Sequence, residues 1–189
     1  MLNYTIGDRR VKIPISWDEV NVDQFLKIQN QAKDGDPIAA IAILCNLPYD
    51  YVFNLKVNEA DFDNFAKALN WFYDDLPDFK TLPLPGSLKI NEKDYKIPDD
   101  LTAGTLGQKI VFEQKVIASI EATGDTTAII DEVLAIYFYP AVTGKPFDPE
   151  DLEETRKAIR NCSIMQAYPI AYFFLTNLLK YSKLKKQPS

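Results

Sequence analysis

Residues 88–98 read LKINEKDYKIP, and they restate the opening of the chain, where residues 4–14 read YTIGDRRVKIP. Each stretch has a short β-rich run, a polar turn and a second β-rich run, which is the pattern typical of a β-hairpin. The expected turns are residues 7–10 and 91–94. The same hairpin is therefore predicted twice in one chain.

The repeat continues into the helix that follows each hairpin. Asn21 and Gln24 are spaced as a capping box, in which the first residue caps a helix and the glutamine reaches back to it. Thr105 and Gln108 have the same spacing and stand 84 residues later. We interpret the chain as an internal duplication, with each hairpin followed by a capped helix.

Later in each half, prolines recur at a longer spacing. Pro48 and Pro77 are followed 92 residues later by Pro140 and Pro169. The eight additional residues fit a longer helical region after Thr105. Pro48 and Pro140 are predicted to be corners between helices, because proline lacks the N–H that a helix interior needs.

The expected fold is mainly α with two short β-hairpins, arranged as two related modules of one hairpin and three helices, plus a C-terminal helix. The first module spans residues 1–77, with helices from 21 to about 34, from 36 to 47 and from 58 to before Pro77. A proline-rich connector spans 78–86, and the second module spans 87–189. Its additional helix is expected over about 169–185.

Composition excludes several classes of function. The net charge of −6 disfavours nucleic acid as a partner, and the absence of histidine removes histidine-based catalysis and the commonest transition-metal ligand. Cys45 and Cys162 lie in apolar helical stretches and are expected to be free, buried thiols in a reducing cytoplasm. No apolar run reaches the roughly 20 residues that cross a membrane. We expect no cofactor, metal or small-molecule substrate.

Three short motifs have an ordinary structural interpretation beside a chemical one. Residues 104–109 read GTLGQK, but a phosphate loop needs four residues between its glycines, so a helix entry is favoured. Residues 34–36 read DGD and lack the further ligands of a calcium loop. Residues 148–154 are acidic and favour a helix start with Pro149 in the first position, although a hydrolase using Glu150, Asp151, Glu153 and Glu154 remains an alternative.

Two groups of residues are candidates for binding other proteins. The aromatic residues near Pro48 and near Pro140, the latter being Tyr137, Phe138 and Tyr139, are either core or an exposed anchor, because aromatic rings dominate interface hot spots. The basic residues near the C-terminus are either a solvated helix end or a contact for an acidic surface. They are Lys180, Lys183, Lys185 and Lys186.

Residues 13–25, IPISWDEVNVDQF, resemble a pattern found in tailed bacteriophages. They are similar to small helical structural and tail-assembly proteins of phages that infect Bacteroidetes, the crAss-like group included. The likeness continues in the apolar stretch 38–47 and in Leu101-Thr102-Ala103-Gly104, although Gln108 is displaced from the usual place. The resemblance covers most of the chain, and its motifs describe a fold without an active site.

The resemblance implies a virion component made in the bacterial cytoplasm, such as a neck-ring or tail subunit held in several copies by other phage proteins. A tail-assembly chaperone that is absent from the mature particle is the first alternative. A regulatory adaptor of the host and the acidic-cluster hydrolase are the others.

Overall fold

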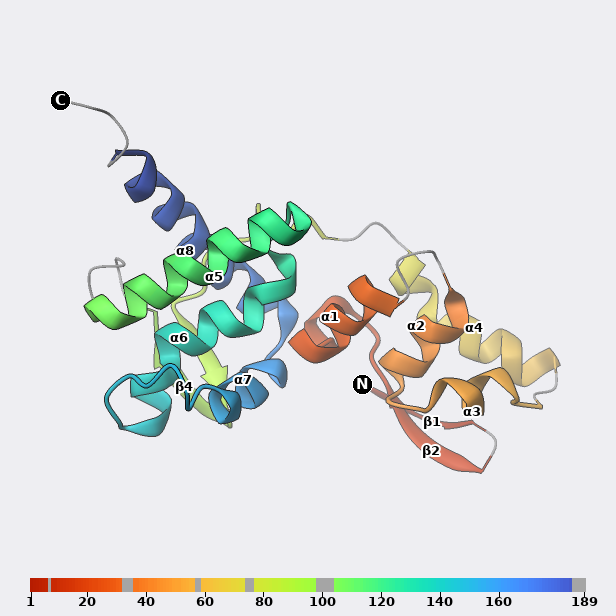
Figure 1. Cartoon of the computed structure of the whole chain (residues 1–189). Coiled ribbons are helices and arrows are strands. Elements are labelled where there is room, and N and C mark those ends of the chain that lie inside the picture. The colour runs from red at the N-terminus through yellow and green to blue at the C-terminus, as the bar shows by residue number, and fades with distance from the viewer. Residues whose placement is uncertain (7, 32–35, 57–58, 74–76, 98–103, 185–189) are drawn as a thin grey trace. The chain divides into compact units, whose positions relative to one another are not determined.

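The computed structural model describes residues 1–6, 8–31, 36–56, 59–73, 77–97 and 104–184 (Figure 1). It is mainly helical with two short antiparallel hairpins, which confirms the predicted fold class. The chain forms two compact units, residues 1–78 (unit 1) and 79–189 (unit 2). The proline-rich connector belongs almost entirely to unit 2, because Phe79 is buried and stacks on Tyr168 with ring centroids 4.9 Å apart.

Both predicted hairpins are present, with shorter turns than expected. Strand β1 (Leu2–Ile6) pairs with β2 (Arg9–Ile13), and β3 (Ser87–Ile90) pairs with β4 (Lys93–Lys96). In the second hairpin the two loop residues, Asn91 and Glu92, both have positive φ, at 48° and 64°. Such a two-residue loop matches the right-handed twist of its strands, so pairing resumes at Lys93.

Unit 1 continues with a 3-10 turn (Trp17–Glu19) and four helices. These are α1 (Val22–Gln31), α2 (Pro37–Leu44), α3 (Tyr49–Phe53) and α4 (Glu59–Tyr73). The Trp17 ring joins three of these elements, because it lies against Phe25 of α1 and against Trp71 and Phe72 of α4. Asp36 caps α2 by accepting hydrogen bonds from the N–H groups of Ile38 and Ala39, as its position before Pro37 predicts. The short α3 was not predicted.

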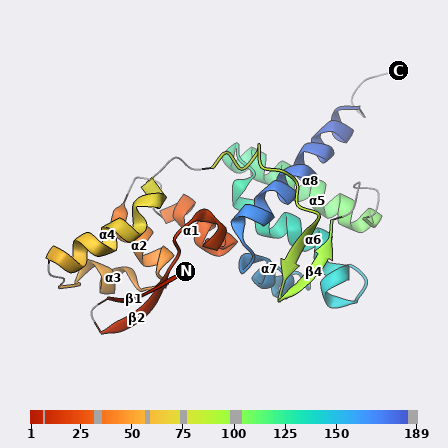
Figure 2. The same ribbon diagram turned by 180° about the vertical axis from the view of Figure 1, so that it is seen from behind.

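Unit 2 is built around one central helix. Its helices are α5 (Leu106–Thr123), α6 (Ile130–Thr143), α7 (Glu153–Arg160) and α8 (Ile164–Leu184), with a 3-10 turn (Thr127–Ile129) before α6. Helix α6 packs against the other three, and both views show it among them (Figures 1 and 2). It is apolar almost all round, which is typical of a helix buried on several sides.

Three predicted boundaries in unit 2 are wrong. Pro140 lies inside α6 and forms no corner between helices. Helix α7 begins at Glu153 instead of Pro149, and α8 begins at Ile164 with Pro169 inside it. A proline inside a helix leaves the carbonyl four residues earlier without its N–H donor, so α6 needs another donor for Ile136 O.

Gln108 supplies that donor, and Gln24 makes a similar bond in unit 1. The Gln108 side-chain amide donates to Ile136 O at 2.7 Å, and the Gln24 amide donates to Leu44 O at 3.0 Å. Ile136 stands four residues before Pro140, so Gln108 compensates for the hydrogen bond that this proline cannot make. Leu44 is the last residue of α2, so Gln24 bonds a carbonyl that the end of the helix leaves free.

The same glutamines complete the two predicted capping boxes. Asn21 N–H donates to Gln24 Oε1 at 3.1 Å, and Gln24 N–H donates to Asn21 Oδ1 at 2.8 Å. Thr105 N–H donates to Gln108 Oε1 at 2.8 Å, and Gln108 N–H donates to Thr105 Oγ1 at 3.2 Å. One side chain in each unit thus caps its own helix and bonds the next helix, and this shared arrangement supports the duplication.

Candidate functional site

Helix α5 carries an exposed apolar face, made of four aliphatic side chains that we call the α5 stripe. These residues are Leu106, Ile110, Ile117 and Ile120, which are 73%, 46%, 55% and 40% exposed. Single exposed aliphatics are ordinary on a protein surface, whereas a contiguous group marks a contact site. The α5 stripe is the strongest candidate for a functional surface in unit 2.

The α5 stripe is separate from the face by which α5 packs on its own unit. At 3.6 residues per turn, the four stripe positions fall within an arc of about 80°. The buried side chains of α5 fall in a second arc centred about 120° away. They are Gln108, Phe112, Val116 and Ser119. Helix α5 therefore has one apolar face toward the core and a second one exposed.

Three charged side chains belong to this exposed face or border it. Glu113 falls in the middle of the stripe, and Lys109 lies one turn before it at one edge; both are half-buried. Glu121 is exposed at the opposite edge. Lys115 points elsewhere, because its Nζ lies 2.9 Å from Glu132 Oε1 on α6. The stripe thus has one central carboxylate with an ammonium group one turn away.

The α5 stripe was missed at the sequence level, although a signal was present. Its spacing of four, seven and three residues is helical, but Phe112 and Val116 follow the same period in a different phase. When a helix has two apolar arcs, its apolar residues are spaced as if they formed one wide buried face. Separating the two arcs would have identified the second one.

The aromatic residues that were candidates for an exposed anchor are in the core. Phe138 and Tyr139 are only 2% and 1% exposed, because they lie on the central helix α6, so the exposed interpretation is wrong for them. Tyr137 is half-buried and stacks on Phe174 with ring centroids 3.9 Å apart. Burial raises the pKa of the Tyr137 phenol.

Exposed aromatics occur at the other proline, in unit 1. Tyr49 and Phe53 follow Pro48 on α3, and they are 45% and 62% exposed. Their rings stack on each other with centroids 6.1 Å apart. The idea of an aromatic patch near a proline therefore applies to Pro48 and not to Pro140.

The basic residues of the C-terminal region are only partly placed. Lys180 and Lys183 lie within α8, which ends at Leu184. Lys185 and Lys186 lie outside the described residues, so the predicted basic contact stays a prediction. Residues 34–35 of the DGD motif are also outside the described ranges, and Asp36 is the α2 cap described above.

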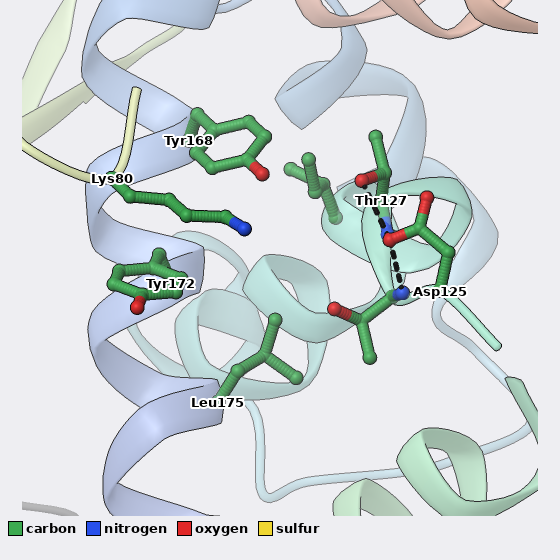
Figure 3. Close-up of a pocket in the computed structure, with 8 residues that line it drawn as sticks. Lys80, Asp125, Thr127, Tyr168, Tyr172 and Leu175 are labelled. Atoms are coloured by element: carbon green, nitrogen blue, oxygen red, sulfur yellow. Dashed lines mark hydrogen bonds between the residues drawn. The ribbon is translucent and has the colours of Figure 1, made fainter. Parts of the chain in front are cut away.

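A pocket of about 150 Å³ lies in unit 2, against one side of α8 (Figure 3). Lys80 enters it between Tyr168 and Tyr172, and Asp125 lies on the opposite wall. The remaining lining residues are Thr126, Thr127, Ile130 and Leu175. The lining thus combines one ammonium group, one carboxylate and two tyrosine rings with smaller side chains.

The Asp125 carboxylate serves mainly to hold the loop that forms this pocket. Its Oδ1 accepts hydrogen bonds from Thr126 N, Thr127 N and Thr127 Oγ1 at 2.7, 3.0 and 2.9 Å. Burial raises the pKa of Asp125, but these bonds and the charge of Lys80 outweigh it, so the net pKa is lowered. A carboxylate held ionised and already bonded is a poor general acid.

The acidic segment 148–154 does not converge on one point. Asp151 accepts from the Tyr139 hydroxyl at 2.9 Å and from Lys145 Nζ at 3.3 Å, and both bonds lower its pKa. Glu154 pairs with Lys157 at 2.9 Å. Asp148 accepts from Glu150 N–H at 2.9 Å. The carboxylates of Asp148, Asp151 and Glu154 thus have separate local partners, which is typical of a loop and helix start and not of paired catalytic carboxylates.

A buried ion cluster links α6 to α7. Asp131 is 1% exposed, and its Oδ2 accepts from Arg156 Nε and Nη2 at 3.2 and 3.1 Å and from Arg160 Nε at 2.8 Å. Its Oδ1 accepts from Glu132 N–H at 2.9 Å. Because both carboxylate oxygens are bonded within the protein, the cluster is a structural tie between the two helices.

The residues 104–109 enter a helix, as predicted. The N–H groups of Thr105 and Gln108 donate to Gln108 Oε1 and Thr105 Oγ1, so both donors are occupied within the helix entry itself. Over the described parts of the chain, no cluster of three metal-ligating side chains occurs, and no helix is both long and apolar enough to span a membrane. Cys45 and Cys162 are buried and free, and burial raises both thiol pKa values to about 12.

The side chains described above therefore form an exposed apolar face, an ion cluster between two helices, and helix caps. Comparison with protein-family models, with curated proteins and with solved structures found no match for this chain.

Proposed function

We propose that this chain is a non-enzymatic structural subunit that acts by assembling with other protein chains. The observation that carries the proposal is the α5 stripe, an exposed apolar face on a helix whose other apolar face already serves the core. Covering such a face with another protein removes apolar surface from water, which favours association by roughly 25 cal/mol per Å² before its costs.

The electrostatic evidence supports a role based on contacts. Thiolate is the nucleophilic form of cysteine, and a pKa of about 12 leaves both thiols protonated at neutral pH. Asp125 and Asp151 have lowered pKa values, whereas a general acid needs a raised one. The pKa values of these groups thus favour their structural hydrogen bonds and burial over proton transfer.

The resemblance of residues 13–25 to phage proteins suggests which assembly the chain belongs to. It supports a component of a tailed-phage particle, in a neck ring or tail, with other phage proteins or further copies of this chain as neighbours. A tail-assembly chaperone is the alternative, and it would use the same exposed face for a transient partner.

Quantitative proteomics of purified particles from a phage that encodes this chain tests the proposal. A virion subunit is expected in several copies per particle, in a fixed ratio to the major tail protein. A chaperone is expected in infected cells, bound to tail proteins, and missing from the particles. Replacing Ile110 and Ile117 with glutamate should reduce incorporation, whereas Ala118→Glu on the exposed polar side of α5 should not.

Absence from both particles and tail-protein complexes would contradict the proposal. So would unchanged incorporation of a folded Ile110→Glu/Ile117→Glu variant, because the proposal depends on this face. Circular dichroism checks that the variant is folded, and the exposure of both isoleucines predicts that it is.

A further inference from the structure

We infer that the α5 stripe binds the α5 stripe of a second copy of this chain, with the two helices antiparallel. This inference rests on the proposed function, and it names one of the partners that the function requires. Four properties of α5 and unit 2 lead to it: the spacing of the stripe, its central charges, the charge balance of unit 2 and the size of the face.

The spacing of the stripe is nearly the same in both directions. Leu106 and Ile120 stand seven residues on either side of Glu113, and Ile110 and Ile117 stand three and four residues from it. In an antiparallel pair centred on Glu113, Leu106 lies opposite Ile120 of the second copy. Ile110 then lies within one residue of Ile117 of the second copy, so both aliphatic pairs meet in nearly the same register. A two-fold contact requires such a self-complementary surface.

The charges at the centre fit the same arrangement. Lys109 precedes Glu113 by one turn on the same side of the helix. When the second helix runs in the opposite direction, its Lys109 lies one turn beyond Glu113 of the first copy. The order of charges along the contact is then one ammonium group, the two opposed carboxylates and the second ammonium group. Each carboxylate has an ammonium group one turn away on either side, which favours a defined register.

The charge of unit 2 allows two copies to approach. Residues 79–189 contain 14 basic and 14 acidic side chains, whereas residues 1–78 contain 7 basic and 13 acidic ones. The whole net charge of −6 therefore belongs to unit 1. A contact made through unit 2 meets no net repulsion from its own unit.

The size of the face predicts a weak contact. A helix of 18 residues is about 27 Å long, and one stripe buries less than the roughly 1,600 Å² of a standard stable interface. We therefore expect the free chain to associate reversibly in the micromolar range. Such a contact becomes persistent only where many copies are held together in an assembly.

Sedimentation velocity over a concentration series tests the association. The full chain should shift from monomer to dimer, and Ile110→Glu or Ile117→Glu should raise the dissociation constant at least tenfold. The matched control is Ala118→Glu, which places the same charge on the exposed polar side of α5 and should leave the constant within about twofold. Lys109→Glu should weaken the dimer. Adding Glu113→Lys should restore it, because positions 109 and 113 then again carry opposite charges in both copies.

Engineered cysteines test the direction and register. Chains carrying Ile110→Cys, mixed with chains carrying Ile117→Cys and treated with copper–phenanthroline as oxidant, should form a disulfide between the two variants. Ile110→Cys alone should link to itself much less. Cys45 and Cys162 are buried with thiol pKa values of about 12, so they should contribute little to the product.

A chain that stays monomeric up to several hundred micromolar would overturn the inference. Equal linking of Ile110→Cys with itself would overturn the antiparallel register. Both results leave the proposed function intact if particles contain the chain in several copies and the Ile110→Glu/Ile117→Glu variant is not incorporated. In that case the stripe binds a different protein.

Discussion

The two units use one glutamine in the same way but place it in different surroundings. Gln24 in unit 1 is half-buried, and Gln108 in unit 2 is 4% exposed, yet each closes a capping box and bonds a free carbonyl of the next helix. In unit 1 that carbonyl is at the end of α2, whereas in unit 2 it lies inside α6, which continues through Pro140. The same side-chain bond therefore serves a helix end in one unit and a proline within a helix in the other.

The units differ most in the helix that carries the glutamine. Helix α1 has 10 residues and α5 has 18, and the eight additional residues include Ile117 and Ile120. At the start of these helices, Val22 is fully buried, whereas Leu106, its counterpart 84 residues later, is 73% exposed. The longer helix of unit 2 thus contributes half of the exposed stripe that unit 1 lacks.

Asp131 gives the largest expected difference between the units. It corresponds to Ala39 at the spacing of 92 residues, so unit 1 has no carboxylate at the matching position. Asp131→Ala leaves Arg156 and Arg160 without their shared carboxylate, and we expect unit 2 to lose about 3–5 kcal/mol of unfolding free energy. Hydrogen exchange measured by mass spectrometry reads the two units separately and should show the loss in unit 2 and not in unit 1.

Glu154→Ala is the control for the Asp131 variant. It removes the exposed pair with Lys157 and should change the unfolding free energy by no more than about 0.5 kcal/mol. If Asp131→Ala were as mild as this control, the cluster would not be the tie between α6 and α7.

Gln108→Ala should have the next largest effect. It removes the Gln108 side-chain bond of the α5 capping box and leaves Ile136 O unbonded inside α6, with an expected loss of about 2–3 kcal/mol in unit 2. Gln24→Ala should cost unit 1 about 1 kcal/mol, because its site is partly open to water that can replace the lost bonds. Urea unfolding combined with hydrogen exchange measures both losses.

A double-mutant cycle with Pro140→Ala isolates the bond to Ile136 O. Alanine at position 140 restores a backbone N–H that can donate to Ile136 O, so Gln108→Ala should cost less in this background, by about 1 kcal/mol or more. Additive effects of the two substitutions would show that Gln108 does not compensate for the proline.

The hairpins, the capping boxes and the unit boundary were predictable because local chemistry determines them. Capping and turn formation involve residues a few positions apart, and Asn21, Gln24, Thr105 and Gln108 carry that signal in their types and spacing. The path of α6 through Pro140 was not predictable, since it depends on a donor 28 residues away in the sequence. The Asp131 cluster and the α5 stripe were missed for the same reason, because both depend on which helices pack together.

Alanine substitutions of Val22 and Leu106 should differ less in their effect on stability, and they test the exposed face directly. Val22→Ala removes buried methyl groups and should lower the stability of unit 1 by about 2 kcal/mol. Leu106→Ala should change that of unit 2 by less than about 0.5 kcal/mol when measured at low micromolar concentration, where the chain is monomeric. A large loss at Leu106 under these conditions would mean that the stripe is covered within the chain itself.

The last comparison uses the two thiols, which report separately on the opening of each unit. Cys45 and Cys162 both have a pKa raised from 9.0 to about 12 in the folded protein, because burial disfavours the thiolate. A raised pKa stabilises the folded state fully below pH 9, and the stabilisation is lost as the pH rises toward 12, because the unfolded thiol ionises first. The loss should be on the order of 1 kcal/mol per pH unit for each thiol.

Thiol labelling with a disulfide reagent between pH 7 and 10 should therefore be slow and limited by opening of each unit. Cys45→Ser and Cys162→Ser variants separate the two rates, and the unit that opens more readily is the one whose remaining cysteine reacts faster. Rapid labelling of either native thiol at pH 7 would contradict its burial, and equal rates in both variants would show that the two units open together.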